Sequence, residues 1–536
     1  MPGWRNWQTR RSQKPVEITL RVGSTPTLGT RSSMKYTVKP TDILKFDGDT
    51  LLVSAFLDKA GERMLSKEAA LLDRTAAGAL TLLLADEDFK PAVGSTFVWY
   101  LQDMPFRRVI LVGFGRKEKL TSVALQTAVA AGIRRAGMIG GKRVGFAVPE
   151  EIALAFESQK AGQGIVVGAA LGSYIFIRHK SEGDKELKKQ LDELVLLTSA
   201  GRLSAMALGV RTGELIANAV RLARDLVNEP PSVTTPTHLA DVARSFVKKG
   251  SPVTCEVFGK AEIAKMGMGG LMGIAQGSDE EPKFIRLNYK GGGRKTIVLA
   301  GKGITFDTGG LSLKPAEHME TMKLDMAAAA TVLAVFSVLP ALAPKINVIG
   351  LIAATENMLG PKAVKPGDVV KIMNGKTVEI LNTDAEGRMV LADALSYASK
   401  HLKPDGIIDL ATLTGACMVA LGQDIAGVFS NNTALGAAVL KAAKDAGELV
   451  WEMPLAPEYK ELLKSPVADL KNIGGGRYGG AITAALFLEE FVGKDIPWVH
   501  LDIAGPAFAE KDTPLMPRGG TGFGVRMLLE FLQNAA

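Results

Sequence analysis

The segment at 382–388 reads Asn-Thr-Asp-Ala-Glu-Gly-Arg and places two carboxylates and a guanidinium within five residues. Asp384 and Glu386 are two residues apart and Arg388 follows two residues later, so a turn can direct all three groups at one point. Taken alone, the pattern is also typical of an acidic loop at a helix N-terminus, where carboxylates are stabilising. A second group of charged residues favours a catalytic or metal-binding role for this segment over the structural one.

That second group lies upstream and is rich in glycine. Gly-Lys-Gly-Ile-Thr-Phe-Asp at 301–307 follows a short apolar run, Lys314 comes soon after it, and Asp325 stands within Met-Lys-Leu-Asp-Met at 322–326. Glycines allow the backbone to approach a ligand closely and to bend sharply. The two groups together therefore supply carboxylates and lysines that a fold can collect in one pocket.

Four carboxylates in one partly buried pocket would repel one another unless cations neutralised them. The four are Asp307, Asp325, Asp384 and Glu386. Two divalent ions neutralise such a set directly, and paired metals commonly activate water for hydrolysis. Oxygen ligands suit Mg or Mn, and Zn also accepts carboxylates. None of the five histidines has the paired spacing of a zinc-binding helix, and His318, the nearest, is interpreted as a solvated loop residue.

The segments at 301–307, 322–326 and 382–388 resemble the signatures of the leucyl aminopeptidase family, the two-metal cytosol aminopeptidases. The resemblance covers essentially residues 215–536, in the family's order and spacing. It continues in four further segments, at 224–231, 409–415, 500–505 and 521–526.

The resemblance implies two divalent metal ions per subunit, Mn or Zn, and a specific set of ligands. Those ligands are Lys302, Asp307, Asp325, Asp384 and Glu386. An ammonium group has no lone pair, so Lys302 would have to bind as a neutral amine. Nearby metal charge and burial can lower its pKa enough for that.

The resemblance also implies the reaction and its substrates, which are peptides with a free N-terminus. Lys314 would stabilise the negative oxygen of the tetrahedral intermediate, and Arg388 would hold a bicarbonate ion that moves a proton from water to the leaving amine. Apolar first residues such as Leu are expected to be preferred, although Met322 is equally well explained by core packing. The expected substrate-binding residues are Met322, Asn382, Ala385, Thr412, Leu413 and Gly415.

One position departs from the family pattern. The family usually has Gly where this chain has Ala328, within Ala-Ala-Ala-Ala at 327–330. Alanine is the better helix former by up to about 1 kcal/mol. We therefore expect tolerance, unless a neighbouring backbone packs closely enough for the added methyl group to shift Asp325.

The composition, with 47% hydrophobic and 22% charged residues, is ordinary for a globular chain and compatible with an enzyme. The cysteines, Cys255 and Cys417, provide no disulfide framework, which is consistent with a cytoplasmic location, and Cys417 is interpreted as buried packing. The most apolar helix expected, at 326–339, is too short to span a bilayer. The resemblance further implies a homohexamer.

Two alternative functions remain open at this point. Some bacterial relatives also bind DNA as architectural proteins, but residues 1–33 hold +5 of the net charge of +8, which leaves little electrostatic attraction elsewhere. The other alternative is a different two-metal hydrolase, such as a phosphatase. A gel shift with and without salt tests DNA binding. A substrate with a blocked α-amine separates an aminopeptidase from another two-metal hydrolase, because an aminopeptidase should not cleave it.

The elements that must position the charged groups can be read from periodicity. Strand-like runs at 369–373 and 377–381 flank Asn374-Gly375, which predicts a hairpin with a two-residue turn. Apolar spacing predicts a helix at 389–399, and an apolar run at 407–411 predicts a strand before Thr412. The segment at 382–388 thus connects a strand to a helix.

The whole chain is predicted to be α/β with two domains: a smaller N-terminal α/β domain at 34–204 and a larger C-terminal catalytic domain at 229–536, with a mixed central sheet flanked by helices. A helix at 205–228 links them. Residues 1–33 are interpreted as a disordered extension or a misassigned start, with Met34 as the first credible residue. Strands in the smaller domain are expected at 50–57, 108–114, 143–148, 165–170 and 193–198, although 165–170 also fits a helix.

Overall fold

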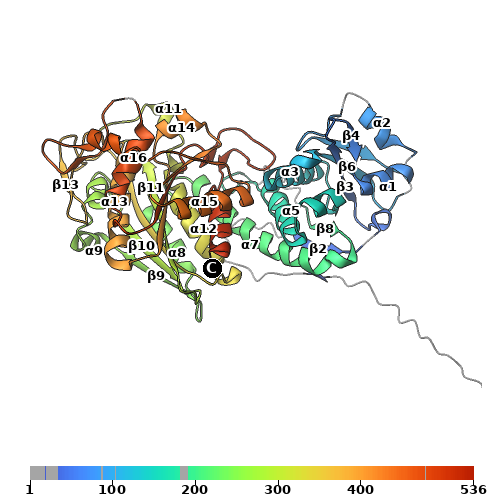
Figure 1. Cartoon of the computed structure of the whole chain (residues 1–536), viewed down its shortest axis with the longest axis horizontal. Helices are drawn as coiled ribbons and strands as arrows, with labels where there is room; N and C mark the ends of the chain where they lie inside the picture. The colour runs from blue at the N-terminus through green and yellow to red at the C-terminus, as the bar shows by residue number, and fades with distance from the viewer. Residues whose placement is uncertain are drawn as a thin grey trace, which may run out of the picture.

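The computed structural model describes residues 18–19, 34–40, 42–75, 77–85, 89–102, 104–181, 191–476 and 478–535. The interpretation of residues 1–33 falls outside the described residues, apart from the two-residue strand β1 at Ile18–Thr19, and stays a prediction. Figure 1 shows two lobes, a smaller one from the N-terminal part of the chain and a larger one from the C-terminal part.

The N-terminal domain is an α/β sandwich around one sheet with the strand order β1-β2-β8-β7-β3-β6-β5, and β4 pairs with β3. Neighbouring residues of β3 face opposite sides, so Leu51 packs with α1 and α2 while Leu52 packs with α3 and α5. The elements are β2 (Lys35–Lys39), β3 (Thr50–Leu57), β4 (Arg63–Leu65), α1 (Lys67–Thr75), α2 (Ala79–Ala85), β5 (Thr96–Tyr100), β6 (Arg108–Arg116), α3 (Ser122–Met138), β7 (Arg143–Ala147), α4 (Glu150–Ala155), α5 (Ser158–Gly172) and β8 (Glu193–Leu197).

The strand expected at 165–170 is wrong, and its helical alternative is correct. These residues lie inside α5, which is buried on nearly every side between α3 and α7. A Cβ on Gly162 would lie 2.6 Å from the Met206 carbonyl oxygen, and one on Gly168 would lie 2.5 Å from that of Gln126. A helix enclosed on both sides carries apolar and small residues all round, so its sequence loses the periodicity that marks a surface helix.

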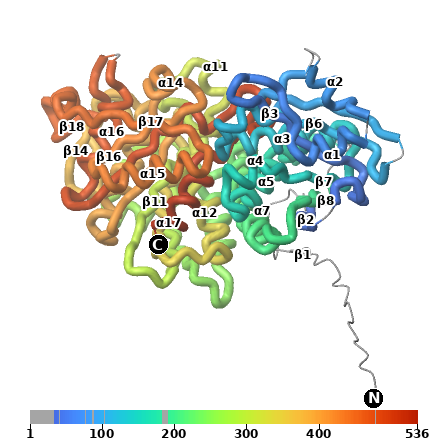
Figure 2. Tube along the Cα trace, turned by 45° about the vertical axis from the view of Figure 1, so that its right-hand side comes forward, coloured from blue at the N-terminus to red at the C-terminus, as the bar shows by residue number. Residues whose placement is uncertain are grey.

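Helix α7 (Leu203–Asn228) joins the two domains. The sequence predicts this linking helix at 205–228. Its first half packs against α5, and its second half packs against the core of the larger domain (Figures 1 and 2). The ion pair between Lys160 and Glu530, 2.7 Å long, also ties the lobes together. The smaller domain is therefore packed directly on the larger one.

The C-terminal domain contains an eight-stranded mixed sheet with the order β17-β16-β19-β15-β11-β12-β10-β9. Its four central strands, β19, β15, β11 and β12, are parallel, while β16, β10 and β9 join antiparallel. The predicted fold class is confirmed. The strands are β9 (Val253–Phe258), β10 (Lys283–Tyr289), β11 (Thr296–Asp307), β12 (Asn347–Asn357), β15 (Gly406–Ala411), β16 (Ala426–Ser430), β17 (Val450–Glu452) and β19 (Trp498–Asp502).

Helices cover both faces of this sheet. Ile297 and Leu299 of β11 pack with α7, α8, α12, α15 and α17, whereas Val298 and Ala300 pack with α10, α13 and α16. The helices are α8 (Pro236–Ser245), α9 (Lys260–Lys265), α10 (Gly269–Ala275), α11 (Ala316–Met319), α12 (Ala327–Leu342), α13 (Glu386–Tyr397), α14 (Gly415–Leu421), α15 (Thr433–Ala446), α16 (Gly480–Glu489) and α17 (Val525–Asn534).

The hairpin before the acidic segment forms as predicted, but its turn differs from the predicted one. Strands β13 (Val369–Lys371) and β14 (Thr377–Glu379) pair antiparallel as predicted. The Ile372 N–H donates to the Lys376 carbonyl (2.8 Å), so residues 373–375 form a three-residue loop in place of the expected two-residue turn. Gly375 has φ +100°, as three-residue hairpin loops require at this position. Strand β14 then pairs with the short strand β18 (Leu470–Lys471).

The predicted core helix at 326–339 belongs to a longer helical run. The helix itself is α12, whose 16 residues are too few to span a bilayer, as expected. Together with α11 and the turns between the two helices, the stretch Ala316–Leu342 has 27 residues and would qualify as a membrane span by length and hydropathy. However, 78% of its most apolar window is buried inside the protein, as in the core helix of a globular domain. Its apolar character is therefore explained by packing within the C-terminal domain.

A close helix–strand contact occurs at the position that departs from the family pattern. Ala328 is fully buried in α12, and its carbonyl oxygen would lie 2.8 Å from a Cβ built on Gly301 of β11. The neighbouring backbone thus approaches closely, and Gly301 provides the space. Asp325 nevertheless keeps its contacts with Lys302 and Thr412, so the fold accommodates the alanine.

Candidate metal centre

The carboxyl ends of the four parallel strands meet at one edge of the sheet, and each strand delivers a polar residue there. Asp307 ends β11, Asn357 ends β12, Thr412 follows β15, and Asp502 ends β19. Ligands of open α/β sheets bind at this edge, because the loops that leave the strands surround a crevice. The topology therefore gathers residues that are far apart in the chain.

A β-bulge allows Lys302 and Asp307 to reach the same site from one strand. In a regular strand two residues five apart point to opposite faces. The pairing of β11 with β12 shifts between Ile304 and Asp307, where three steps along β11 match two steps along β12. The extra residue reverses the alternation, which places both side chains beside the segment at 382–388.

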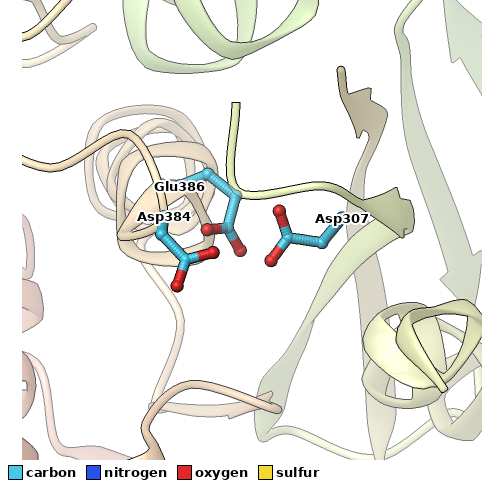
Figure 3. Close-up of side chains that lie close together, drawn as sticks. All are labelled: Asp307, Asp384 and Glu386. Atoms are coloured by element: carbon cyan, nitrogen blue, oxygen red, sulfur yellow. The ribbon is translucent and has the colours of Figure 1, made fainter. Parts of the chain in front are cut away.

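Three carboxylates converge at the centre of the site (Figure 3). One oxygen each from Asp307, Asp384 and Glu386 lie within 4.8 Å of one another. Asp307 comes from the end of β11, and Glu386 begins α13, three residues earlier than the helix start expected at 389. The last three residues of the acidic segment thus lie in the first turn of the helix, which directs Glu386 back toward the strand.

Two lysines lie between these carboxylates. Lys302 Nζ is 2.8 Å from Asp325 Oδ2, 2.7 Å from Glu386 Oε1 and 2.9 Å from the Thr412 carbonyl oxygen, to which it donates. Lys314 Nζ is 2.9 Å from Asp307 Oδ2 and 2.5 Å from Asp384 Oδ1. These ammonium groups partly neutralise a cluster that is otherwise strongly negative.

Burial and mutual repulsion shift the acid–base behaviour of the cluster. Burial, and then the charge of Glu386, raise the pKa of Asp307 to about 7. Burial also raises the pKa values of Asp325 and Glu386. For Lys302, burial favours the neutral amine, but Asp325 and Glu386 outweigh it and raise its pKa above the ordinary value. Among the protein's own groups, Lys302 is therefore held as the charged ammonium.

Gly387 leaves the space that Lys302 occupies. A Cβ at this position would lie 2.7 Å from Cδ, Cε and Nζ of Lys302. Because Lys302 is buried and held by three partners, it cannot move aside cheaply. The glycine in the acidic segment is thus required by the neighbouring strand.

Arg388 lies on α13 next to Glu386 but outside the cluster of ion pairs. Its guanidinium is buried, donates to the Asn472 carbonyl oxygen (2.8 Å), and has no hydrogen-bond partner at Nε among the described residues. Burial lowers the pKa of Arg388 to about 10, which still leaves it charged at neutral pH. A buried cation with a free donor is suited to hold an anion.

The remaining predicted residues surround the cluster to different degrees. Thr412 donates from Oγ1 to Asp325 Oδ1 (2.7 Å), and Asn382 Oδ1 accepts from the Asp384 N–H (2.8 Å). Met322 and Leu413 are half-buried against the two cores of the domain, so core packing contributes at both positions. Ala385 is buried, Gly415 is exposed at the start of α14, and His318 is exposed on α11.

Several residues that organise the site were not identified from the sequence. Asp502 accepts from the N–H groups of Leu413 and Thr414 (3.2 and 3.4 Å) and from Thr414 Oγ1 (2.6 Å), which holds the loop after β15. The side-chain amide of Asn472 accepts a hydrogen bond from the Leu381 N–H and donates one to the Asn382 carbonyl oxygen. Asn357 and Thr383 connect the two halves of the carboxylate cluster. A polar residue at the end of an apolar strand was the available signal for Asp502 and Asn357.

The donor set fits divalent metal ions. Glu386 Oε2 is buried and has no hydrogen-bond partner among the described residues, a costly arrangement for a charged oxygen. Four carboxylates face only two lysines at the centre, so cations would relieve the remaining repulsion. Carboxylate oxygens and an amine are acceptable ligands for Mn and Zn.

Comparison with known proteins identifies similar chains over nearly the full length. The model of the cytosol aminopeptidase family catalytic domain matches residues 221–529, and that of the family's N-terminal domain matches residues 53–183. A probable cytosol aminopeptidase of Geobacter sulfurreducens is 42% identical, covering 93% of this chain and 99% of the relative. One of Alkaliphilus metalliredigens is 42% identical, covering 86% and 92%.

The fold of this chain is also similar to those of solved aminopeptidase and related structures. A mutant of tomato leucine aminopeptidase superimposes with a TM-score of 0.83 at 31% identity, covering 95% of this chain and 98% of its own. The bottromycin maturation enzyme BotP in complex with Mn superimposes with a TM-score of 0.78 at 33% identity, covering 91% and 99%.

Proposed function

Because the chain belongs to the cytosol aminopeptidase family and is an aminopeptidase, we propose that it uses divalent metal ions to release N-terminal residues, with Leu and other apolar residues preferred. The observation that carries this proposal is the convergence of Asp307, Asp384 and Glu386 within 4.8 Å. The related BotP structure in complex with Mn supports Mn as one suitable ion.

Two ions, Mn or Zn, would be held by five side chains: Lys302, Asp307, Asp325, Asp384 and Glu386. When bound, they would polarise the scissile carbonyl and activate water for its hydrolysis. Lys302 would have to lose its proton to act as a ligand, because the protein's own carboxylates keep it charged. Metal affinity is therefore expected to be coupled to proton release.

Two further side chains are proposed to act on the substrate during hydrolysis. Lys314 lies at the edge of the cluster, less buried than Lys302, and can donate to the oxygen that becomes negative in the tetrahedral intermediate. The buried guanidinium of Arg388, with its unpartnered Nε, would hold bicarbonate as the proton carrier.

Substrate placement is assigned to the loop after β15. Asp502 accepts hydrogen bonds from the N–H groups of Leu413 and Thr414, which holds the loop in place. We propose that the Leu413 carbonyl and the Gly415 N–H pair with the extended peptide. The first side chain would lie near Met322, whose flexible thioether suits several apolar residues.

Activity against Leu-p-nitroanilide and Leu-Gly tests the proposal, with metal-stripped protein and with protein reloaded with Mn or Zn. Stripping should abolish turnover and reloading should restore it, whereas N-acetyl-Leu-p-nitroanilide should resist cleavage because its amine is blocked. Turnover by the stripped protein would refute the metal requirement. Cleavage of the acetylated substrate would refute the exopeptidase assignment, and hydrolysis of a phosphate monoester instead would favour another two-metal hydrolase.

Gly387→Ala is expected to lower both stability and activity. The alanine favours the helix by up to about 1 kcal/mol, but the clash with the buried Lys302 costs about 1–3 kcal/mol, so the thermal midpoint should fall. Its methyl group would displace Lys302, since it falls 2.7 Å from the lysine side chain, and activity should fall by about 10–100-fold. Gly273→Ala in α10, whose Cβ would meet only Val370 at 3.5 Å, is the matched control. Full activity in Gly387→Ala would show that Lys302 can relocate without consequence.

The proposal also includes assembly and location. We propose a cytoplasmic homohexamer that acts on peptides with a free N-terminus, in line with the family resemblance of the sequence. Exposed apolar side chains such as Val419, Trp451 and Tyr478 in the larger domain are consistent with a surface that another subunit covers.

A further inference from the structure

Asn357 lies at the centre of the site, although the proposed function gives it no role. It ends β12 directly opposite Asp307 of β11 in the pairing register, and only 2% of its surface is exposed. The parallel strands therefore bring an uncharged amide to the same sheet edge as the carboxylates. From this position the side chain can form hydrogen bonds with Asp307 and with the loop that contains Thr383.

The side-chain amide of Asn357 has two N–H donors, and both are used. Nδ2 donates to Asp307 Oδ1 (2.7 Å) and to the Thr383 carbonyl oxygen (3.0 Å). Both partners are acceptors, so the opposite orientation of the amide would place its oxygen against two oxygens. One side chain thus joins the end of β11 to the segment at 382–388.

Further contacts fix this bridge at both ends. The Thr308 N–H and Oγ1 donate to the Asn357 carbonyl oxygen (2.9 and 2.8 Å), and the Gly309 N–H donates to Asp307 Oδ1 (2.8 Å). At the other end, Thr383 Oγ1 donates to the Gly309 carbonyl oxygen (2.6 Å). Asp307 therefore has one oxygen held by the protein and the other left facing Lys314 and the pocket.

We propose that Asn357 is a positioning residue that sets the separation between Asp307 and the Asp384–Glu386 turn, and thereby the metal affinity of the site. The inference rests on the proposed metal-dependent function. Metal coordination tolerates errors of only a few tenths of an ångström in ligand position. Loss of a group that orients a ligand typically lowers metal affinity or activity by about 10–100-fold.

Binding of Mn to the metal-stripped full-length protein, followed by the electron paramagnetic resonance signal of free Mn, tests this inference. Asn357→Leu is similar in size, adds no charge and removes both donors, and its dissociation constant for Mn should rise by about 10–100-fold. Asn347→Leu, at the other end of β12, is the matched control, because the Asn347 amide donates to the Gly293 carbonyl far from the cluster. Saturating Mn should restore most of kcat in Asn357→Leu.

The possible results separate the inference from the function on which it rests. A wild-type protein that binds neither Mn nor Zn contradicts the proposed function itself. Wild-type binding together with unchanged affinity in Asn357→Leu overturns the positioning role, as does a loss of kcat that saturating Mn does not restore. If Asn357→Leu does not fold, Asn357→Ser, which keeps one donor, takes its place under the same criteria.

Discussion

Replacing Glu386 with alanine is expected to reduce kcat by about 10³-fold or more, because one substitution disrupts both halves of the site. Glu386 is 2% exposed, contacts Lys302 at 2.7 Å, and shares the convergence point with Asp307 and Asp384. Removing one well-placed electrostatic group already costs about 10²–10³ in turnover, and Glu386 would help to hold both of the proposed metal ions. Steady-state kinetics with saturating metal measure the loss.

Metal content and a matched variant complete this experiment. Glu386→Ala should bind less than its full complement of Mn after dialysis, since a proposed ligand is missing. Glu356→Ala removes a half-buried carboxylate that accepts from Ser278 instead, and it should retain activity. Near-normal turnover in Glu386→Ala would refute the assignment of the centre.

Replacing Lys314 with alanine is expected to lower kcat by about 10²–10³-fold while KM changes only a few-fold. The ammonium group is 2.9 Å from Asp307 and 2.5 Å from Asp384, so it lies at the edge of the carboxylate cluster, where the proposed mechanism places the carbonyl oxygen that becomes negative. A group that acts mainly in the transition state affects kcat more than substrate binding. Metal affinity should be maintained or increased, because a competing cation is removed from the carboxylates.

Lys323→Ala serves as the control for this variant. Lys323 lies nine residues after Lys314 in the chain, but its ammonium group donates to the Asn228 carbonyl oxygen (2.7 Å) and not to the carboxylate cluster. Its loss should leave kcat close to the wild-type value. A Lys314→Ala enzyme with normal kcat, or with a loss confined to KM, would assign the lysine to substrate binding and not to stabilisation of the intermediate.

The elements that were predicted well are those with strong local periodicity. Strand β3 occupies the residues predicted for it, and β6, β7 and β8 agree within two residues at each end. Alternation or short apolar runs between polar boundaries mark such strands. Helix α5 was ambiguous because burial on all sides removes its periodicity, and the hairpin loop is one residue longer because strand register depends on pairing.

The sequence by itself determined the family and the identity of the charged groups, because residue type and spacing are preserved in short motifs such as the one at 382–388. It also determined the fold class, since alternating strands and helices allow few topologies. Which of these groups meet was decided by the tertiary structure. The bulge after Ile304 turns Lys302 and Asp307 to one side, and Gly387 leaves room for the lysine.

The roles of Asn357 and Asp502 also depended on the tertiary structure, because they arise from the side-by-side placement of β11, β12, β15 and β19. Neither residue is next to a motif residue in a way that spacing reveals its partner. Hydrogen bonds between residues 50 or more positions apart, such as that from Asn357 to Asp307, form only when the parallel strands align. Local sequence therefore specified the chemical groups, and long-range strand pairing specified their geometry.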